Sequence, residues 1–393
     1  MKYRRNFSAV IAAFSLAALV GCGGSNSSSI TPDPSLPDPD EDRFSQIQLD
    51  ASSNTDYVYL NLERGEVIDL SAAQAAMSQE WHIAFRRFAV QLNGGASGSG
   101  EVAGALVGLQ EDFYSEDGEP NASVFTNATP DSELAVLLAD YENPDSWIKD
   151  KVVTLLTGPS AVDGGWYIYN PAGGTMSANS GNGWLLRSGE GNSYARMRAT
   201  ELTFNTRAGE GVESFTFEFD VQSPGSNAFN DTATFTGSLP AGGGELCFDF
   251  NANSLAACTG SSWDLKIAFW GRDFYLRSNG GVSGAGNGAV FGSFPWSELS
   301  LWSNATHDPN GVLVTARYQS DTTSGVFDQH SWYSYNLLGM HRLWPNYRTY
   351  MVDADQGDES SSRYLLQIIG YYDATGAGGF PVIRWRTLEN GEI

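Results

Sequence analysis

The sequence predicts an all-β protein in which two homologous antiparallel β-rich units follow a lipoprotein signal and a flexible tether. Short runs of alternating apolar and polar residues, as at residues 215–220 and 382–386, are typical of strands with one buried face. Glycine is abundant, with 44 in 393 residues, and indicates many turns. Helical periodicity is scarce, and its best candidate is residues 132–141. A glycine-rich block that occurs twice indicates the two units.

The amino terminus has the pattern of a bacterial lipoprotein signal over residues 1–22. Basic residues precede an apolar run at residues 7–20, which is too short to span a bilayer and ends just before Cys22. We therefore expect Cys22 to become the lipidated first residue. An ordinary secretory signal, in which Cys22 is only a thiol, is the alternative. Gly23 stands where an aspartate would favour retention in the inner membrane, so we expect the outer membrane.

Gly, Ser, Pro and Asp dominate the chain from residue 23 to about residue 42, with almost nothing apolar to bury. The proline-rich run at residues 32–40 favours extended polyproline geometry. We predict a tether over residues 23–55 that holds the folded part away from the lipid surface.

The duplication rests on matched motifs that occur in the same order. Asn-Gly-Gly begins both glycine-rich blocks, at residues 93–100 and 279–286. Trp-Tyr-x-Tyr-Asn likewise occurs twice, at residues 166–170 and 332–336. These pairs predict unit 1 over residues 56–225 and unit 2 over residues 226–393. No helix with a lysine follows either block, so we expect the glycines to serve tight turns and not a phosphate site.

Charge, cysteine content and the absence of catalytic motifs limit the classes of function that we expect for the protein. A net charge of −24 argues against nucleic acid as a partner, because phosphate binding needs clustered Lys and Arg. Cys247 and Cys258 are eleven residues apart and are expected to form a disulfide in an oxidising envelope. The sequence contains no recognisable catalytic motif, so we expect no enzyme.

At the tryptophan and glycine motifs the chain resembles the HmuY family of bacterial haem-binding lipoproteins. The marks are Trp-His-Ile-Ala-Phe at residues 81–85, a related run at residues 263–269, the Asn-Gly-Gly turns and the Trp-Tyr-x-Tyr segments. The resemblance implies an all-β hemophore that takes haem through two axial side chains from loops and passes it to an outer-membrane receptor. The chain departs from the family with His82 in place of an aspartate, and with two units in place of one.

Haem iron accepts imidazole nitrogen or thioether sulfur, and the chain has four histidines. We predict His307 and His341 as the axial pair, because both lie in expected loops beside the second Trp-Tyr-x-Tyr segment. His82 is expected to face solvent or a cross-strand partner, and His330 to begin a strand. The further candidates in unit 2 are Met340 as a substitute donor, Trp344 and Tyr347 against the macrocycle, and Arg342 or Arg348 at a propionate.

Unit 1 has Pro130 where unit 2 has His307, and Met176 near the place of Met340. It is therefore expected either to be structural or to bind through Met176. The alternative function for the whole chain is a carbohydrate-binding or purely structural surface lipoprotein, because 11 tryptophans and many tyrosines can also form a sugar-stacking surface. An aromatic row on one sheet face, with the histidines apart, would favour carbohydrate.

Overall fold

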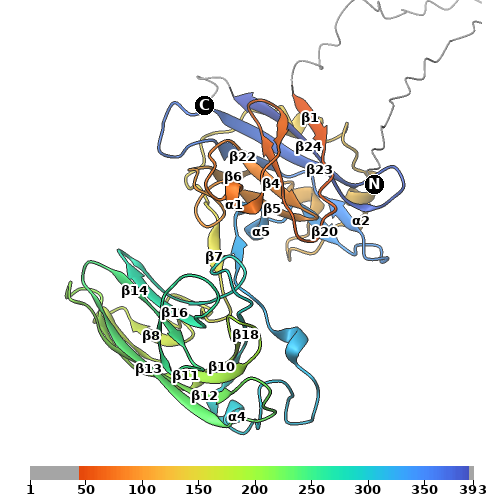
Figure 1. Cartoon of the computed structure of the whole chain (residues 1–393). Coiled ribbons are helices and arrows are strands. Elements are labelled where there is room, and N and C mark those ends of the chain that lie inside the picture. Colours follow the sequence, from red (N-terminus) through yellow and green to blue (C-terminus); the bar gives the residue numbers. More distant parts are fainter. Residues whose placement is uncertain (1–43, 389–393) are drawn as a thin grey trace, which may run out of the picture. The chain divides into compact units, whose positions relative to one another are not determined.

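The structure of the protein, a computed structural model, describes residues 44–388 (Figure 1). The predicted signal, Cys22 and the tether up to residue 43 lie outside the described residues. Antiparallel sheets with a few short helices make up the described part, so the predicted all-β class is confirmed. No helix within residues 44–388 has the length and apolarity that crossing a membrane requires.

The first and last parts of the described chain form what we call the terminal lobe, residues 44–150 and 325–388. In Figure 1 this lobe combines the orange start with the blue end of the chain. Its larger sheet has the order β1 (Ser45–Gln48), β24 (Gly378–Leu388), β23 (Arg363–Tyr372), β22 (Thr349–Asp353) and β6 (Ala103–Gly108). Its second sheet has the order β3 (Glu66–Ile68), β2 (Val58–Asn61), β4 (Ile83–Arg86) and β5 (Ala89–Leu92), and β20 (Tyr333–Tyr335) pairs with β21 (Leu343–Pro345).

Short helices fill the connections of the terminal lobe. They are α1 (Ala72–Ala75), η1 (Glu111–Phe113), α2 (Ala122–Asn127), α3 (Leu134–Leu137) and α5 (Val326–Gln329). The helix expected over residues 132–141 is thus limited to α3. At and just after the end of α3, the carbonyls of Leu137 and Ala139 accept from the Arg386 side chain of β24, so they are satisfied without a further helical turn.

The central lobe comprises residues 154–321. Its larger sheet has the order β13 (Asp231–Pro240), β12 (Gly211–Gln222), β11 (Tyr194–Asn205), β10 (Asn182–Arg187) and β18 (Ala289–Pro295). In addition, β9 (Thr175–Ala178) pairs with β11, and β8 (Tyr167–Asn170) pairs with β9. Its second sheet has the order β15 (Ser254–Ala256), β14 (Gly244–Asp249), β16 (Leu265–Trp270) and β17 (Asp273–Ser278). The lobe also contains α4 (Trp296–Leu299) and η2 (Thr315–Arg317). Between the lobes, β7 (Lys151–Val153) pairs with β19 (Thr322–Ser324).

Each lobe has its own core where its two sheets face each other. In the central lobe the long strands contribute phenylalanines such as Phe217 and Phe235, and Phe235 stacks on Phe248 of the second sheet at 4.8 Å between ring centroids. In the terminal lobe Phe85 packs in the same cluster as Ile368 and Trp385. Alternation along β12 and β24 puts these side chains on the inner faces, as the sequence predicted.

The two cores do not coincide with the predicted units at residues 56–225 and 226–393. Each core takes strands from both units, because β6 of unit 1 pairs with β22 of unit 2, and β18 of unit 2 pairs with β10 of unit 1.

The expected tether over residues 23–55 also needs correction at its end. Residues 45–48 form β1 on the edge of β24, and Leu49 and Ala51 are buried behind it, so folded structure begins at or before residue 45.

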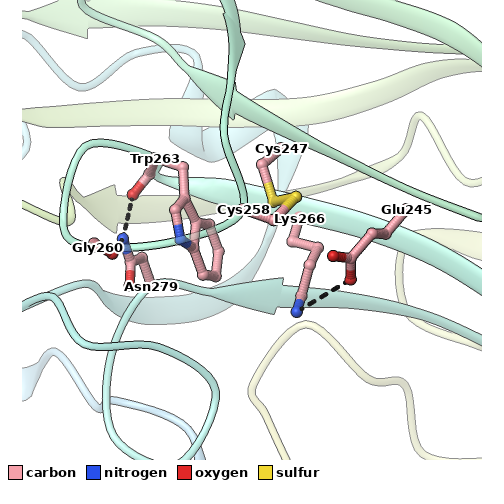
Figure 2. Close-up of a disulfide and its surroundings, with 7 residues drawn as sticks. All are labelled: Glu245, Cys247, Cys258, Gly260, Trp263, Lys266 and Asn279. Carbon is pink, nitrogen blue, oxygen red and sulfur yellow. Dashed lines mark hydrogen bonds and ion pairs between the residues drawn. A yellow bond between two sulfur atoms is a disulfide. The ribbon is translucent and has the colours of Figure 1, made fainter.

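The expected disulfide between Cys247 and Cys258 is confirmed, and it joins β14 to the segment after β15 (Figure 2). Cys247 is buried, and Lys266 on the neighbouring strand pairs with Glu245 at 3.4 Å. The bond therefore closes the hairpin at the edge of the second sheet in the central lobe.

Replacement of both Cys247 and Cys258 by alanine is expected to lower the free energy of unfolding by about 2–3 kcal/mol, because the unfolded chain gains loop entropy. Chemical denaturation followed by near-ultraviolet circular dichroism measures the change. The wild-type chain treated with reductant should lose a similar amount, and equal stability of the wild-type and variant chains would contradict the role given to this bond.

Candidate functional site

The repeated Asn-Gly-Gly blocks form the same buried hydrogen-bond arrangement in both lobes. The Asn93 amide donates to the carbonyls of Ser78 and Trp81 at 2.9 and 2.8 Å, and its side-chain oxygen accepts from the Gly100 N–H at 3.1 Å. Asn279 repeats this in the central lobe, where its amide donates to the carbonyls of Gly260 and Trp263 at 3.1 and 2.7 Å (Figure 2). Its side-chain oxygen accepts from the Gly286 N–H at 3.0 Å.

The close packing around Asn93 and Asn279 requires glycine at positions within the blocks, because a side chain there would clash. A Cβ atom at Gly98 would lie 2.0 Å from the Asn93 side-chain oxygen, and one at Gly284 would lie 2.0 Å from that of Asn279. These contacts give the glycines of both blocks a role in the fold, as the sequence predicted.

A buried aspartate fixes each block to the segment that leaves its lobe. Asp150 accepts from the Leu92 N–H at 3.2 Å and from the Ser97 hydroxyl at 2.6 Å. Asp321 accepts from the Ser278 N–H at 3.2 Å in the equivalent position. Burial raises the pKa of Asp150 to about 6 and also raises that of Asp321. No sequence motif indicated either residue, and their shared place, immediately before the paired strands β7 and β19, is visible only in the structure.

His82 is buried, so of the two expectations, solvent or a cross-strand partner, the structure agrees with the second. Its Nδ1 accepts from the Leu62 N–H at 3.0 Å. In the central lobe Asp264 takes the same place, because its side chain accepts from the Phe250 N–H at 2.9 Å. Burial lowers the pKa of His82 to about 4 and raises that of Asp264 to about 7. His82 therefore has a structural role, and its ring nitrogen is engaged by the backbone.

His341 lies in the loop that joins β20 to β21. The Nδ1 atom of its ring is 2.7 Å from the Tyr335 hydroxyl, and its backbone N–H donates to the side-chain oxygen of Asn336 at 2.9 Å. Met340 and His341 both have positive φ, at +62° and +56°, and the Met340 side chain is 79% exposed. Among the described residues the Nε2 atom of His341 has no hydrogen-bond partner, so this nitrogen is available to a metal.

His307 belongs to the central lobe, where its N–H donates to the Asn304 side chain at 2.7 Å and its Nδ1 is 3.1 Å from the Thr306 hydroxyl. The structure does not bring His307 and His341 together, since each lies among residues of a different lobe. His330 is at the end of α5, where burial and then Arg348 lower its pKa. It does not begin a strand as expected.

The other predicted ligand contacts of unit 2 are mostly engaged in packing. Arg342 lies over the Tyr372 ring at 4.4 Å. Trp344 packs against the cluster that contains Tyr347, and its buried Nε1 has no hydrogen-bond partner within the described chain. Arg348 lies 4.8 Å above the Tyr114 ring and donates to the Ser331 carbonyl at 3.1 Å. Of the two predicted arginines, only Arg348 lines a large cleft.

This cleft, of about 910 Å³, lies in the terminal lobe and is formed by two segments that are far apart in sequence. One is the segment around η1, with Tyr114 and Glu116, and the other follows α5, with Tyr333 and Tyr335. His341 adjoins the cleft through its contact with Tyr335. The second segment carries the Trp-Tyr-x-Tyr motif and was predicted from it, whereas the segment around η1 carries no motif and was not predicted. The complete lining is Leu109, Glu111, Tyr114, Ser115, Glu116, Gly118, Pro120, Asp328, Gln329, Ser331, Tyr333, Ser334, Tyr335 and Arg348.

A smaller hollow of about 360 Å³ in the central lobe contains Met176. Its lining also includes Phe204, Phe269 and Phe274, together with Tyr169 and Arg272. Met176 lies opposite Tyr169 on the β8–β9 ladder, whereas Leu343 lies opposite Tyr335 on the β20–β21 ladder. Met176 thus occupies the place of Leu343 and not that of Met340. Residues 44–388 contain no cluster of three or more His, Cys, Asp or Glu side chains that could hold a metal ion.

Residues 53–218 match the family model of the HmuY protein. The HmuY resemblance is confirmed for this segment. The matched HmuY segment starts before β2, includes Trp81, Asn93, Asp150 and Trp166, and ends within β12, so it passes from the terminal into the central lobe. The match does not extend to unit 2, and the hairpin that bears His341 lies outside it. No curated protein matches the chain.

Three solved structures show a distant likeness. A putative HmuY-like haem-binding protein of Bacteroides vulgatus is 11% identical, and the alignment covers 88% of this chain and 91% of that chain with a TM-score of 0.30. A putative lipoprotein of Bacteroides fragilis is 9% identical, with 88% of this chain and 91% of that chain covered and a TM-score of 0.31. An apo HmuY analogue of Tannerella forsythia is 9% identical, with 88% of this chain and 96% of that chain covered and a TM-score of 0.30. At these TM-scores the likenesses carry no argument about this chain.

His82→Asn is expected to remove an acid-sensitive part of the stability while it keeps an acceptor for the Leu62 N–H. Because the pKa of His82 falls from 6.5 to about 4 on folding, the unfolded chain binds more protons between these values. The contribution is present above pH 6.5 and lost as the pH falls. Urea unfolding should show the wild-type chain losing about 2 kcal/mol more than the variant between pH 7.5 and pH 5. Parallel losses in both chains would contradict this account.

Proposed function

We propose that the protein binds haem in the terminal-lobe cleft, with His341 as the axial ligand. The observation that carries this proposal is the HmuY match of residues 53–218, which include the segment around η1 that forms one side of the cleft. The other side is the β20–β21 hairpin, where His341 offers a free Nε2 atom. Haem is bound here as cargo and not as a catalytic cofactor.

The residues present fit one imidazole ligand and one propionate partner. The Tyr335 hydroxyl holds the His341 ring through Nδ1, which is how ligating histidines are commonly oriented by a second partner. Tyr114 and Tyr333 provide aromatic surface of the kind that covers a flat ligand. Arg348 is placed in the cleft where it can pair with a propionate. Met340, next to His341, is the substitute donor.

The cleft also contains carboxylates that oppose the charge of the propionates, notably Glu111, Glu116 and Asp328. We therefore place the propionates on the side of Arg348 and not on the side of Glu116. His307 has no part in this site, because it lies in the central lobe. The axial pair expected from the sequence is thus reduced to His341 or Met340, with the opposite iron position left to a second donor from the cleft or to solvent.

We further propose that Cys22 is lipidated, that the lipid anchors the protein in the outer membrane, and that the bound haem passes to an outer-membrane receptor for uptake. The sequence pattern at residues 1–22 supports the anchor, and the proline-rich run supports a spacer between lipid and lobe. The HmuY match supports haem capture.

A haem titration of the chain that begins after Cys22, followed by visible absorbance, tests the site. The wild-type chain should give a saturable spectrum that differs from free haem. His341→Ala should weaken binding at least about tenfold or change the ligation spectrum, because it removes the proposed iron donor. Tyr335→Phe should weaken binding less, because it leaves that donor in place and removes only the hydrogen bond that orients its ring. His307→Ala, a histidine of the same unit outside the cleft, is the matched control and should bind as the wild type does.

If no spectral change beyond free haem occurs, the haem proposal fails. If His307→Ala and His341→Ala have equal effects, binding occurs but the site in the terminal lobe is wrong. Met340→Leu separates the two neighbouring donors, since it should leave the spectrum unchanged when His341 is the ligand.

A second candidate, carbohydrate binding, is favoured by one observation. The lining of the cleft joins three tyrosines with Ser, Gln and Glu side chains, and His307 and His341 are apart. Stacking on tyrosine with hydrogen bonds to hydroxyl groups suits a sugar. An oligosaccharide array probed with the same chain tests this. Binding that is lost with Tyr114→Ala but retained with His341→Ala would favour carbohydrate, and an array without any bound sugar would exclude this candidate for the tested sugars.

A further inference from the structure

The two lobes have the same architecture, although their strands come from different parts of the chain. The larger sheets have the orders β1-β24-β23-β22-β6 and β13-β12-β11-β10-β18, and the smaller sheets have the orders β3-β2-β4-β5 and β15-β14-β16-β17. Each strand in one lobe therefore has a counterpart in the other. With β1, which precedes residue 56, counted in unit 1, the counterparts follow the order of the two sequence units, because β1–β6 correspond to β13–β18, and β8–β12 correspond to β20–β24.

Matched hydrogen bonds support the equivalence of the first halves of the two units. The His82 N–H donates to the Leu60 carbonyl at 3.0 Å, and the Asp264 N–H donates to the Phe248 carbonyl at 2.8 Å. Gly95 pairs with Asp150 in a parallel bridge, and Gly281 pairs with Asp321 in the same way. Together with the arrangement around Asn93 and Asn279, these bonds make the first halves structural copies.

The second halves are equally alike. The Asn179 N–H donates to the Trp166 carbonyl at 2.9 Å, and the Asn346 N–H donates to the Trp332 carbonyl at 3.0 Å. The side-chain amides of these asparagines donate to the carbonyls of the residues before the tryptophans, Gly165 at 3.0 Å and Ser331 at 2.7 Å. The Trp-Tyr-x-Tyr segments therefore begin copies of one structural element.

Within each lobe, a first half packs with the second half of the other unit. β6 pairs with β22 and β1 with β24 in the terminal lobe, while β18 pairs with β10 and β13 with β12 in the central lobe. Because the halves are equivalent, the same contacts could join β6 to β10 and β18 to β22 within single units. From this we infer that the two units have exchanged their second halves within one chain. The first half of each unit forms a lobe with the second half of the other unit.

The hinges of this exchange are the paired strands β7 and β19. Each unit leaves its first lobe after a buried aspartate, Asp150 or Asp321, and passes through one of these strands. The strands are antiparallel, with Val153 opposite Thr322 and Val152 opposite Thr323. Exchange of identical elements between two protomers through a hinge is a known route to dimers, and here the two protomers are the two units of one chain.

The exchange makes the terminal-lobe cleft a composite of both units. Tyr114 and Glu116 come from unit 1, whereas Tyr335 and Arg348 come from unit 2. A haem site in this cleft therefore needs both units, a statement that rests on the proposed function. The exchange itself rests only on strand pairing and is tested without haem.

The test is a specific protease site inserted after Gly225, in the exposed turn between β12 and β13. This glycine has φ +79°, and a Cβ atom there would meet nothing within 4 Å. After cleavage, both fragments should still elute together from a size-exclusion column in native buffer, because each lobe contains strands of both fragments. They should separate only in denaturant. Two folded fragments that separate in native buffer would overturn the exchange.

A crosslink provides a second measurement that does not depend on the insertion. Glu218 of β12 faces Thr234 of β13 in the sheet register, and both side chains are exposed. The uncut Glu218→Cys and Thr234→Cys double variant should form the new disulfide in high yield, detected by mass spectrometry of the digested protein. In a chain without exchange, β12 would pair with β1 and the two cysteines would be apart. Absence of the crosslink in a folded variant would contradict the exchange, and each single-cysteine variant serves as the control.

Discussion

The pairing of β6 with β22, and of β18 with β10, is the constraint on which the rest of the structure depends. These ladders join segments more than a hundred residues apart, and they bring each small sheet into contact with a larger one. Without them each half would expose an apolar face, such as the one carrying Phe85 or Phe217. Burial of these faces is the main favourable term available to a β fold of this kind.

Buried polar groups fix the register of these contacts. Asn93 and Asn279 each satisfy three backbone groups, and Asp150 and Asp321 each accept from the strand beside them. A buried polar group without a hydrogen-bond partner costs more free energy than a formed hydrogen bond contributes. Other arrangements of the chain would leave these groups without partners, so these residues specify a single arrangement. The equivalence of His82 and Asp264 shows that the position needs an acceptor for a backbone N–H and not a particular charge.

Sequence patterns predicted the strands, the disulfide and the fold class, because alternation and cysteine spacing are local signals. The glycine blocks were also interpreted correctly, since the duplicated motif separates residues of the fold from residues of a site. The distribution of the units over two lobes was not predictable, because a strand's partner is decided by packing and not by its own residues. For His82 the sequence left open solvent or a cross-strand partner, and only the structure shows that the Leu62 N–H, directly after the neighbouring strand β2, donates to its ring. Tyr114 and the segment around η1 carry no motif that indicates a cleft.

The proposed haem site combines a residue found from a sequence motif with contacts that only the structure shows. The motif at residues 332–336 led to His341 from the sequence, whereas only the structure shows Tyr335 beside that ring and Tyr114 with Arg348 in the adjoining cleft. A crystal structure of the mature chain grown with haem tests the account most directly. It should show iron bound to Nε2 of His341, with the porphyrin between the segment around η1 and the β20–β21 hairpin, in a lobe where β6 pairs with β22. Iron at His307 or beside Met176, or a terminal lobe made from unit 1 alone, would contradict it.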